Sequence, residues 1–487
     1  MYQKSKRKFN SFIKAIRFWY LWLSLLFVMP KALTPSRLKA LLLALSLFFN
    51  LYLLFSLHAP DYHITRRSSP TTRRHLLFAI ASSSRSWPRR KHYLRLWHSP
   101  ASSTRAFAFL DRAAYPGDDD GAAPVIVSGD TSRFPYTVGG GGGLRSAIRV
   151  ARVVKEIVDR GEAEVRWYVF GDDDTVFFVD NLVQTLAKYD HDRWFYIGSN
   201  SESYMQNVKY GFDMAFGGGG FAISHSLAKV LARVFDSCLM RYGDLYGSDS
   251  RVFSCVAELG VGLTHEPGFH QVDMRGNLFG MLSAHPLSPL VSLHHLDAAD
   301  PIFPNMNNTQ ALEHLFKAVK ADPARIVQQT VCYDRTHSLT VSVAWGYAIQ
   351  VYDGNELLPD LLSLQKTFMP WRRSRSIEAS QYMFKMRDYP RDTCKRPSIF
   401  YLESVVSNNH GGIWSNYTRH NVENCSKENA IKKLKHIRVI SQKLELDVEE
   451  MKAPRRQCCN ILEPSFNDSM TIIIRRCRDD ELISMNI

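Results

Sequence analysis

Short apolar runs and stretches with helical spacing alternate along the first part of the chain. The apolar runs predict buried strands at residues 76–81, 106–110, 125–127 and 165–170. Between them, a basic and aromatic segment at 89–97 and a segment at 144–159 with apolar residues on one face predict helices. Strands that alternate with helices are typical of an α/β domain with a mostly parallel sheet. We assign this domain to residues 75–300.

The pattern changes after about residue 300. Hydrophobic and aromatic stretches follow one another there, and most of the cysteines lie in this part of the chain. This pattern predicts a second, largely β region at residues 301–487.

Residues 40–57 form an uncharged apolar run that predicts a single N-terminal transmembrane helix. Residues 1–39 precede it with nine Lys and Arg residues and no acidic residue, so they are expected to be a cytoplasmic tail, with the apolar patch 18–29 at the membrane interface. Residues 58–74 are polar and predict a stem. A buried helix or a cleaved signal peptide is the alternative interpretation of the apolar run.

The charge and the cysteines agree with this topology. The formal net charge is +14, but much of the excess lies in the N-terminal block, which favours a membrane signal over a nucleic-acid site. All eight cysteines follow the predicted anchor, as disulfides in an oxidising lumen would require. Four glycosylation sequons lie there too, at Asn307, Asn416, Asn424 and Asn467.

The string Gly-Asp-Asp-Asp occurs twice, in two different settings. At 117–120 no strand leads into it, which indicates a solvated loop. At 171–174 it directly follows the apolar strand, so Asp172, Asp173 and Asp174 are expected at the carboxyl edge of the sheet, where α/β proteins bind ligands. Clustered carboxylates suit Mg²⁺ or Mn²⁺ held against substrate phosphates. The turn alone fits a metal site and a solvated loop about equally.

Three later features are candidates for the same site. The run from Gly217 to Gly220 lies between ordered elements and permits close backbone approach to a ligand, although a tight turn would also explain it. Asp249 precedes an apolar helix and is either a functional carboxylate or a helix cap. His270 is either a third metal ligand or a structural histidine. For His294 and His295 a structural role is favoured.

Together these blocks resemble the plant Fringe-related proteins, long grouped as a domain of unknown function and similar to the Fringe and β-1,3-galactosyltransferase superfamily. The matching blocks are SGDTSRF (128–134), RWYVFGDDDTVFFVDNL (166–182), YIGSNSES (196–203), AFGGGGFAIS (215–224), LYGSD (245–249), ELGVGLTHEPGFHQVD (258–273), HPLSPLVSLHHLD (285–297), IFPNM (302–306), VSVAWGYAIQV (341–351) and RRQCC (455–459). The resemblance covers roughly residues 75–480.

The resemblance implies a GT-A fold of Rossmann type, a single-pass type II Golgi membrane protein with a lumenal catalytic part, and inverting, Fringe-like β-1,3 transfer. The donor would be a UDP-sugar carrying a hexose or an N-acetylhexosamine, the cofactor Mn²⁺ (or Mg²⁺), and the acceptor a glycan or glycoprotein. Carried over by residue, the resemblance makes Asp249 the catalytic base. The metal ligands become Asp172, Asp174 and His270. Asp172, Asp173 and Gly217, Gly218, Gly219 and Gly220 would bind the donor.

The chain departs from Fringe at Ser248-Asp249, where Fringe has paired acids, and in the five-glycine insert at 139–143. It also carries the long C-terminal region that Fringe lacks. A single carboxylate leaves open a non-catalytic Golgi protein that binds sugars or acts as a scaffold on the same fold. A metal-dependent phosphoesterase is a weaker alternative, because the sequence offers no clear set of ligands for two metals.

Overall fold

The computed structural model describes residues 43–50, 69–99, 101, 103–113, 121–136, 144–372, 377–420, 430–462 and 468–484. The chain separates into two compact units, Met1–Ser69 and Pro70–Ile487. In the first unit, residues 43–50 are helical. A search of the described helices for a bilayer-spanning stretch found none.

Several sequence predictions concern residues outside the described ones. They are the tail 1–39, the rest of the anchor 40–57, most of the stem 58–74, the first acidic string 117–120, the glycine insert 139–143, and the sequons at Asn424 and Asn467. The anchor and the topology therefore stay predictions.

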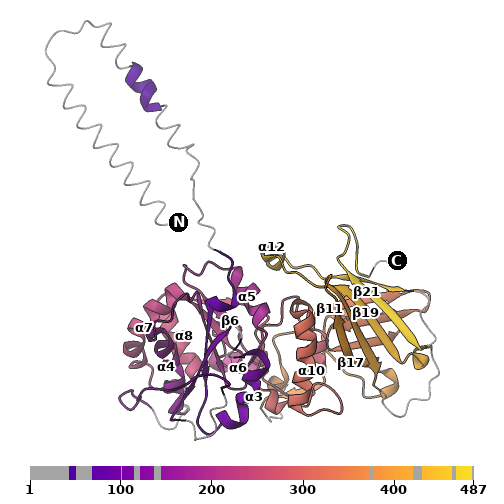
Figure 1. The fold of residues 1–487 in the computed structure, drawn as a ribbon, viewed down its shortest axis with the longest axis horizontal. Helices are drawn as coiled ribbons and strands as arrows, with labels where there is room; N and C mark the ends of the chain where they lie inside the picture. The colour runs from indigo at the N-terminus through magenta and orange to yellow at the C-terminus, as the bar shows by residue number, and fades with distance from the viewer. Residues whose placement is uncertain are drawn as a thin grey trace, which may run out of the picture. The chain divides into compact units, whose positions relative to one another are not determined.

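A seven-stranded sheet forms the first half of the Pro70–Ile487 unit (Figure 1). Its order is β3-β2-β1-β4-β7-β6-β8, and every neighbouring pair is parallel except those that β7 makes with β4 and β6. The strands are β1 (Leu76–Ala81), β2 (Arg105–Leu110), β3 (Val125–Val127), β4 (Trp167–Asp172), β6 (Tyr196–Gly198), β7 (Phe221–Ser224) and β8 (Leu263–His265). The predicted α/β class and parallel-rich sheet are confirmed. Because β7 is antiparallel on both sides, β4, β6 and β8 run the same way and end at one edge.

Alternating side chains along the strands separate two cores. Leu77 and Ala79 of β1 face α4, α7 and α8, whereas Leu76 and Phe78 face the core that includes the C-terminal region. The helices of this half are α3 (Trp87–Trp97), α4 (Ser146–Asp159), α5 (Val179–Ala187), α6 (Tyr204–Tyr210), α7 (His225–Leu239), α8 (Ser248–Glu258) and α9 (Phe279–Ser283).

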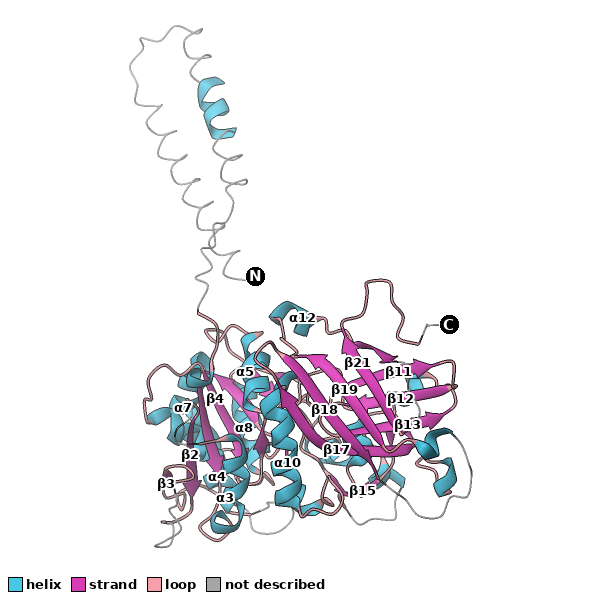
Figure 2. Cartoon of the chain, turned by 45° about the vertical axis from the view of Figure 1, so that its right-hand side comes forward, coloured by secondary structure: helices cyan, strands magenta, loops and turns pink. Residues whose placement is uncertain are grey.

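The C-terminal half is built on an eight-stranded sheet, as the sequence pattern predicts (Figure 2). Its order is β11-β12-β13-β17-β18-β19-β21-β20, antiparallel throughout except between β19 and β21. The strands are β11 (Gln329–Asp334), β12 (Leu339–Ala344), β13 (Ala348–Asp353), β17 (Ser398–Ser407), β18 (Gly412–Arg419), β19 (His436–Gln442), β20 (Cys458–Leu462) and β21 (Ser469–Arg475).

Smaller elements connect the two halves. Helix α10 (Asn308–Ala321) lies between the sheets and contacts both α3 and β17 (Figures 1 and 2). Strand β9 (Met274–Gly276) pairs with β15 (Phe368–Pro370) across the predicted boundary at residue 300. One hydrophobic core is shared by both halves, so the two predicted domains, whose boundary stays a prediction, pack as one compact unit. The remaining elements are β5 (Val176–Phe177), β10 (Ser292–Leu293), α11 (Leu358–Leu361), β14 (Leu364–Gln365), β16 (Met386–Arg387), α12 (Val448–Lys452) and the 3₁₀ turns Arg73–His75, Leu296–Ala298, Pro323–Arg325, Ile377–Ser380, Thr393–Lys395 and Ala430–Lys433.

Disulfides join segments that are distant in the sequence. Cys238–Cys255 links α7 to α8, Cys332–Cys459 links β11 to β20, and Cys458–Cys477 holds the segment after β21 to β20. Cys394 is also disulfide-bonded. Among the described cysteines none is free, which confirms the predicted disulfide bonding.

Candidate active site

The aspartate turn lies at the carboxyl end of β4. Strand β4 is buried up to Gly171, and Asp172 is its last residue. Thr175 closes the turn, because its hydroxyl accepts the N–H of Asp172 at 2.8 Å and donates to the carbonyl of Gly218 at 2.7 Å. The turn is therefore fixed against the glycine run before any ligand binds.

Asp173 is engaged by protein groups, which corrects the prediction that it binds the donor. One carboxylate oxygen accepts the hydroxyls of Ser82 at 2.7 Å and Ser86 at 2.5 Å, and the other accepts Arg90 at 3.0 Å. The side chain is only 5% exposed. Asp173 thus fastens the start of α3 to the aspartate turn, and its oxygens are already occupied.

Asp172 and Asp174 gather with His294, and we call these three residues the metal cluster. One ligand atom from each lies within 4.8 Å of the others. The Nε2 of His294 lies 3.1 Å from Asp174 Oδ1 and 3.7 Å from Asp172 Oδ2. Asp174 is 2% exposed and its Oδ1 makes no hydrogen bond of good geometry, whereas the Asp172 side chain is 42% exposed. Two carboxylates and an imidazole, with one buried oxygen left unsatisfied, fit a divalent cation such as Mn²⁺.

The strand pairing explains why His294 is the histidine that arrives here. Strand β10 pairs antiparallel with β5 in the register Leu293 to Val176, so His294 follows onto the aspartate turn. The ring nitrogen Nδ1 lies 3.3 Å from the carbonyl oxygen of Gln271. A carbonyl only accepts, so Nδ1 carries hydrogen and Nε2 is oriented toward the carboxylates.

The charges in the metal cluster perturb one another. The pKa of Asp172 is raised to about 7 by its enclosure and, against the effect of His294, by the carboxylates of Asp174 and Asp249. The Asp172 side chain keeps 42% of its surface exposed, so repulsion by the neighbouring carboxylates contributes much of this rise in its pKa. Burial acts to raise the pKa of Asp174, but His294 and Arg90 hold it below its ordinary value. Burial also opposes the charge on His294, yet Asp174 and Asp172 raise its pKa to about 9.

His270 lies outside the metal cluster, which corrects its prediction as a metal ligand. Its Nδ1 is 3.0 Å from Glu202 Oε1 and its Nε2 is 2.8 Å from the Nε2 of His285. Glu202 also accepts the N–H of Val272 at 2.8 Å, and His285 donates to the carbonyl of Pro286 at 2.8 Å. We call Glu202, His270 and His285 the buried triad. Both ring nitrogens of His270 are engaged by protein groups, so neither is left for a metal.

The four glycines of the run are packed closely against neighbouring protein atoms. A Cβ on Gly217 would meet a carboxylate oxygen of Asp249 at 2.5 Å, and one on Gly218 would meet the ring of His294 at 2.1 Å. A Cβ on Gly219 would crowd the backbone of Gln271. Gly220 has a positive φ of 84° and lies against Phe177. The glycines therefore let Asp249 and His294 approach the turn, and the predicted contact of their backbone with the donor stays a prediction.

Asp249 faces the glycine run and is not a helix cap. It is the second residue of α8, whose N-cap is Gly247. Its carboxylate accepts the hydroxyl of Ser248 at 3.0 Å and the N–H of Gly217. Burial raises the pKa of Asp249, although these two hydrogen bonds oppose the shift. Asp249 and Asp172 line one small pocket at the sheet edge, so the structure brings these two predicted residues together.

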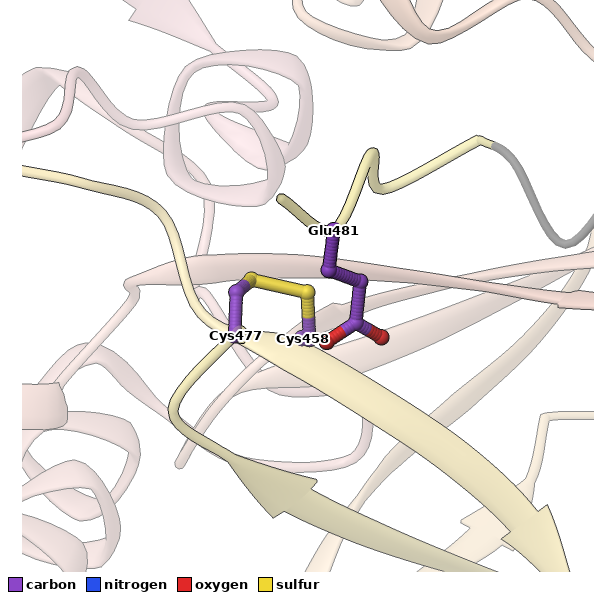
Figure 3. Close-up of side chains that lie close together, drawn as sticks. All are labelled: Cys458, Cys477 and Glu481. Atoms are coloured by element: carbon purple, nitrogen blue, oxygen red, sulfur yellow. A yellow bond between two sulfur atoms is a disulfide. The ribbon is translucent and has the colours of Figure 1, made fainter. Parts of the chain in front are cut away.

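A second group with metal-binding residue types is excluded by its bonding. Cys458, Cys477 and Glu481 lie close together, but the two sulfurs form a disulfide with an S–S distance of 2.00 Å (Figure 3). A disulfide sulfur carries no thiolate and is a poor metal ligand. The metal cluster is therefore the candidate that remains among the described residues.

A family comparison gives the first similarity to known proteins. A family model described as "Protein of unknown function, DUF604" matches residues 206–459, just over half of the chain. The matched part begins in α6 and runs through β7, Asp249 and His294 to the second cysteine of β20.

Individual relatives cover less of the chain. The human and mouse proteins named beta-1,3-glucosyltransferase are each 28% identical over 120 residues, which is 24% of this chain and 23% of theirs. The chain thus spans about a quarter of the length of these curated relatives. Two solved structures of LgtC, an active-site mutant and a galactosyltransferase complex with donor and acceptor sugar analogs, align with 48% and 49% of this chain and 93% and 95% of theirs. Their identities are 11% and 12% and both TM-scores are 0.31, too low to establish a shared fold.

Proposed function

Because the chain belongs to the DUF604 family, whose printed description leaves its function unknown, we propose from the site that it is a glycosyltransferase. It would transfer a hexose or N-acetylhexosamine from a UDP-sugar to a hydroxyl of a glycan or glycoprotein, inverting the anomeric carbon in a Fringe-like β-1,3 transfer on a GT-A fold. The observation that carries the proposal is the metal cluster beside Asp249 at the carboxyl edge of the sheet. The similarity to beta-1,3-glucosyltransferases supports the reaction class.

Asp172, Asp174 and His294 would hold the cation. Imidazole nitrogen beside two carboxylates favours Mn²⁺ over Mg²⁺, which prefers oxygen ligands. When bound, the cation would neutralise the negative charge on the diphosphate leaving group. Arg90 contacts Asp174 Oδ2 at 3.2 Å and keeps that carboxylate ionised and in place.

Asp249 would act as the general base. The acceptor oxygen forms a bond to the anomeric carbon as the bond from that carbon to the diphosphate breaks, and Asp249 takes the acceptor's hydroxyl proton. A pKa raised by burial makes the carboxylate a better proton acceptor than an exposed aspartate. Ser248 and the backbone of Gly217 orient the Asp249 carboxylate, and this fixed orientation would let a single acid act as the base.

A lumenal, membrane-anchored location completes the proposal. The disulfides and the sequons at Asn307 and Asn416 in the described residues support an oxidising, glycosylating compartment. We place the protein in the Golgi as a single-pass type II protein.

The test is donor turnover by the full chain purified in detergent. It is incubated with Mn²⁺ and a panel of UDP-sugars, and free UDP is measured with and without glycan acceptors. Asp249→Asn should keep binding of UDP and Mn²⁺ but reduce transfer by about 10²- to 10⁴-fold, the usual contribution of a general base. Mn²⁺-dependent UDP binding with no turnover of any donor would instead favour the sugar-binding scaffold. Unchanged transfer in the Asn variant would remove Asp249 from the role of base.

A further inference from the structure

A second, larger cleft lies between the two halves of the Pro70–Ile487 unit. Its volume is about 610 Å³, within the range of small-ligand pockets. One wall comes from the loops after α5, β8 and α9, and the other from β11, α12 and the segment before β20. Its lining includes Lys188, Glu266, Pro289, Gln329, Met451 and Arg456.

Most of the charges around this cleft are neutralised in pairs. Lys188 lies 2.5 Å from Glu266, Arg476 lies 2.7 Å from Glu450, and Lys452 lies 2.7 Å from Glu449. Among the charged lining residues that remain, Asp479 is exposed to solvent. Of the lysines and arginines that line the cleft, Arg455 and Arg456 are the two for which the described residues provide no carboxylate partner.

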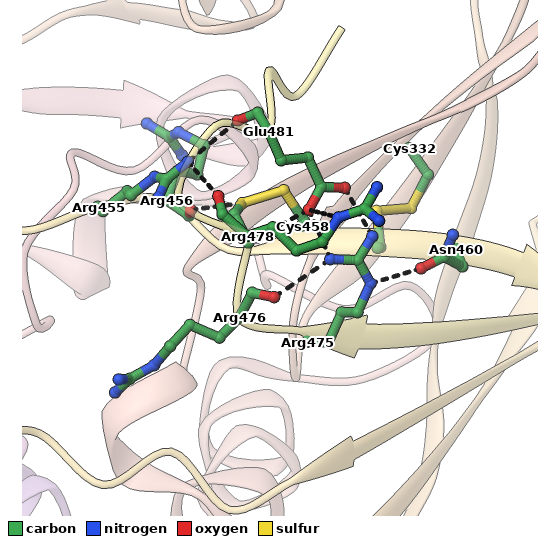
Figure 4. Close-up of a disulfide and its surroundings, with 11 residues drawn as sticks. Cys332, Arg455, Arg456, Cys458, Asn460, Arg475, Arg476, Arg478 and Glu481 are labelled. Carbon is green, nitrogen blue, oxygen red and sulfur yellow. Dashed lines mark hydrogen bonds and ion pairs between the residues drawn. A yellow bond between two sulfur atoms is a disulfide. The ribbon is translucent and has the colours of Figure 1, made fainter. Parts of the chain in front are cut away.

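Arg456 is the better placed of these two arginines. Its Nη1 donates to the carbonyl oxygen of Gln329 at 2.9 Å and lies 3.5 Å from that residue's amide oxygen. Burial lowers the pKa of Arg456, and no acid offsets the effect. Arg455, in contrast, is exposed and donates to the carbonyls of Arg478 and Glu481 (Figure 4). A partly buried guanidinium with unused N–H groups at a cleft wall needs an anion to offset its desolvation.

Covalent bonds hold Arg456 in place. Cys458 and Cys459 follow it and enter separate disulfides, to Cys477 and to Cys332 (Figure 4). The neighbouring Gln457 accepts a hydrogen bond from the buried Arg325, which also pairs with Asp322 at 3.0 Å. Arg456 is thus presented from a rigid wall, which lowers the entropy cost of binding.

The cleft reaches the seven-stranded sheet where β8 ends at His265, and it also contacts the end of α5 at Lys188 and Tyr189. Helix α12, which forms part of the opposite wall, packs against α5. The cleft is therefore a site of its own, and no residue of the metal cluster lines it.

We propose that this cleft binds an acidic oligosaccharide, with Arg456 pairing with a sugar carboxylate. The inference rests on the proposed transferase function only in making this glycan the acceptor. One partly buried guanidinium without a carboxylate partner matches a monoanion and can bind a carboxylate through two parallel hydrogen bonds. The volume is too large for a small inorganic anion, and Pro267, Pro289 and Met451 offer apolar surface for the faces of sugar rings.

The test measures binding of a glucuronic acid-terminated disaccharide to the full chain in detergent by calorimetry, with its methyl ester and sodium sulfate as comparison ligands. The acid should bind at least about tenfold more tightly than the ester, and Arg456→Gln should remove that difference, because a charge-assisted pair contributes roughly 1.5–3 kcal/mol. Arg478→Gln is the matched control. Arg478 is also an arginine of this segment, but it is 77% exposed and does not line the cleft.

Equal binding of acid and ester, or full binding by Arg456→Gln, would overturn the proposal. So would sulfate that binds as tightly as the disaccharide, since the cleft would then be a site for small anions. If the Gln variant fails to fold, Arg456→Lys and a salt titration of the wild-type protein decide, because the acid-specific affinity must weaken with ionic strength.

The outcome is separable from that of the transferase proposal. Asp249→Asn lies in the other site and should leave binding of the disaccharide within about twofold. If transfer occurs, Arg456→Gln should raise KM for the acidic acceptor and leave acceptor-free hydrolysis of the UDP-sugar unchanged. Binding without any transfer would keep the cleft assignment and reject its link to catalysis.

Discussion

The metal cluster and the buried triad contain nearly the same groups and serve different ends. Asp172, Asp174 and His294 leave one buried carboxylate oxygen unsatisfied and one side chain open to solvent. In the buried triad, Glu202 accepts a backbone N–H and faces His270, which in turn bonds to His285. Every ring nitrogen there has a protein partner.

The comparison shows that unused bonding capacity, more than residue type, distinguishes a ligand site from a structural network. A satisfied polar network stabilises one arrangement of the chain. The buried triad anchors Val272 and so supports the loop in which Gln271 orients His294. The buried triad thus supports the position of His294 without contributing a residue to the metal cluster.

Replacing His294 or His270 singly with alanine should give the largest difference between the two groups, measured as the loss of Mn²⁺ affinity. His294→Ala removes a ligand and should weaken Mn²⁺ binding by more than about 100-fold, because even mutation of a ligand's hydrogen-bond partner costs 10- to 100-fold. His270→Ala should keep the affinity within about tenfold. Mn²⁺ binding is followed by electron paramagnetic resonance of the free ion. Stronger loss in His270→Ala than in His294→Ala would reverse the assignment of the third ligand.

Removing the acid from each group should separate stability from ligand binding. Glu202→Gln removes the buried carboxylate that contacts His270 and accepts the N–H of Val272, and it should lower the free energy of unfolding by about 2 kcal/mol. Asp172→Asn removes one of several repelling carboxylates, so the metal-free protein should lose no stability. Urea unfolding in the presence of a chelator measures both. A marked destabilisation by Asp172→Asn would show that its charge is structural.

Adding one methyl group in the glycine run should disturb only the metal cluster. In Gly218→Ala the new Cβ would overlap the His294 ring, so the ring must move and Mn²⁺ affinity should fall by about tenfold, equivalent to about 1.4 kcal/mol. Gly262→Ala is the control, since a Cβ there meets no atom within 4 Å and φ is not positive. Wild-type Mn²⁺ affinity in Gly218→Ala would contradict this prediction, because the loop would then accommodate the methyl group without moving the His294 ring.

The last effect concerns the pH dependence of stability. Burial, followed by repulsion from His270, lowers the pKa of His285 well below its ordinary 6.5. Below pH 6.5 the unfolded chain then binds a proton that the folded chain does not, so stability falls as the pH drops from 6.5 toward the folded pKa. One such group contributes a slope of at most about 1.4 kcal/mol per pH unit. His285→Gln should flatten the unfolding free energy between pH 6.5 and 5, and an unchanged slope would contradict the burial of a neutral His285.

Much of the fold follows from local pattern. The strand predicted at 76–81 is β1 residue for residue, and the helix predicted at 144–159 begins two residues later as α4. The spacing of apolar residues reveals such a helix because the helix buries one face, and an uninterrupted apolar run reveals such a strand because the whole strand is buried. The direction of β7 could not be predicted, since Phe221–Ser224 has the same composition whichever way it pairs.

The candidate site was predictable in part. Asp172, Asp174 and Asp249 were candidates because a carboxylate after a buried strand or in the first turn of a helix stands out locally, and their roles stay predictions. Asp173 and His270 were placed wrongly, because their partners Ser82 and Glu202 are 91 and 68 residues away in the sequence. Arg90 gave no local signal at all, since its role depends on α3 packing against the aspartate turn.

By itself, then, the sequence determined the alternation of strands and helices in the first half, the β-rich second half, the acidic turn at the end of β4 and the presence of cysteines that can pair. Tertiary structure alone decided that His294 and not His270 reaches the aspartates, that the glycines make room for His294 and Asp249, and that Arg456 faces a cleft. The physical reason is that local elements depend on neighbours along the chain, whereas a ligand site depends on which buried atoms remain without a partner after packing.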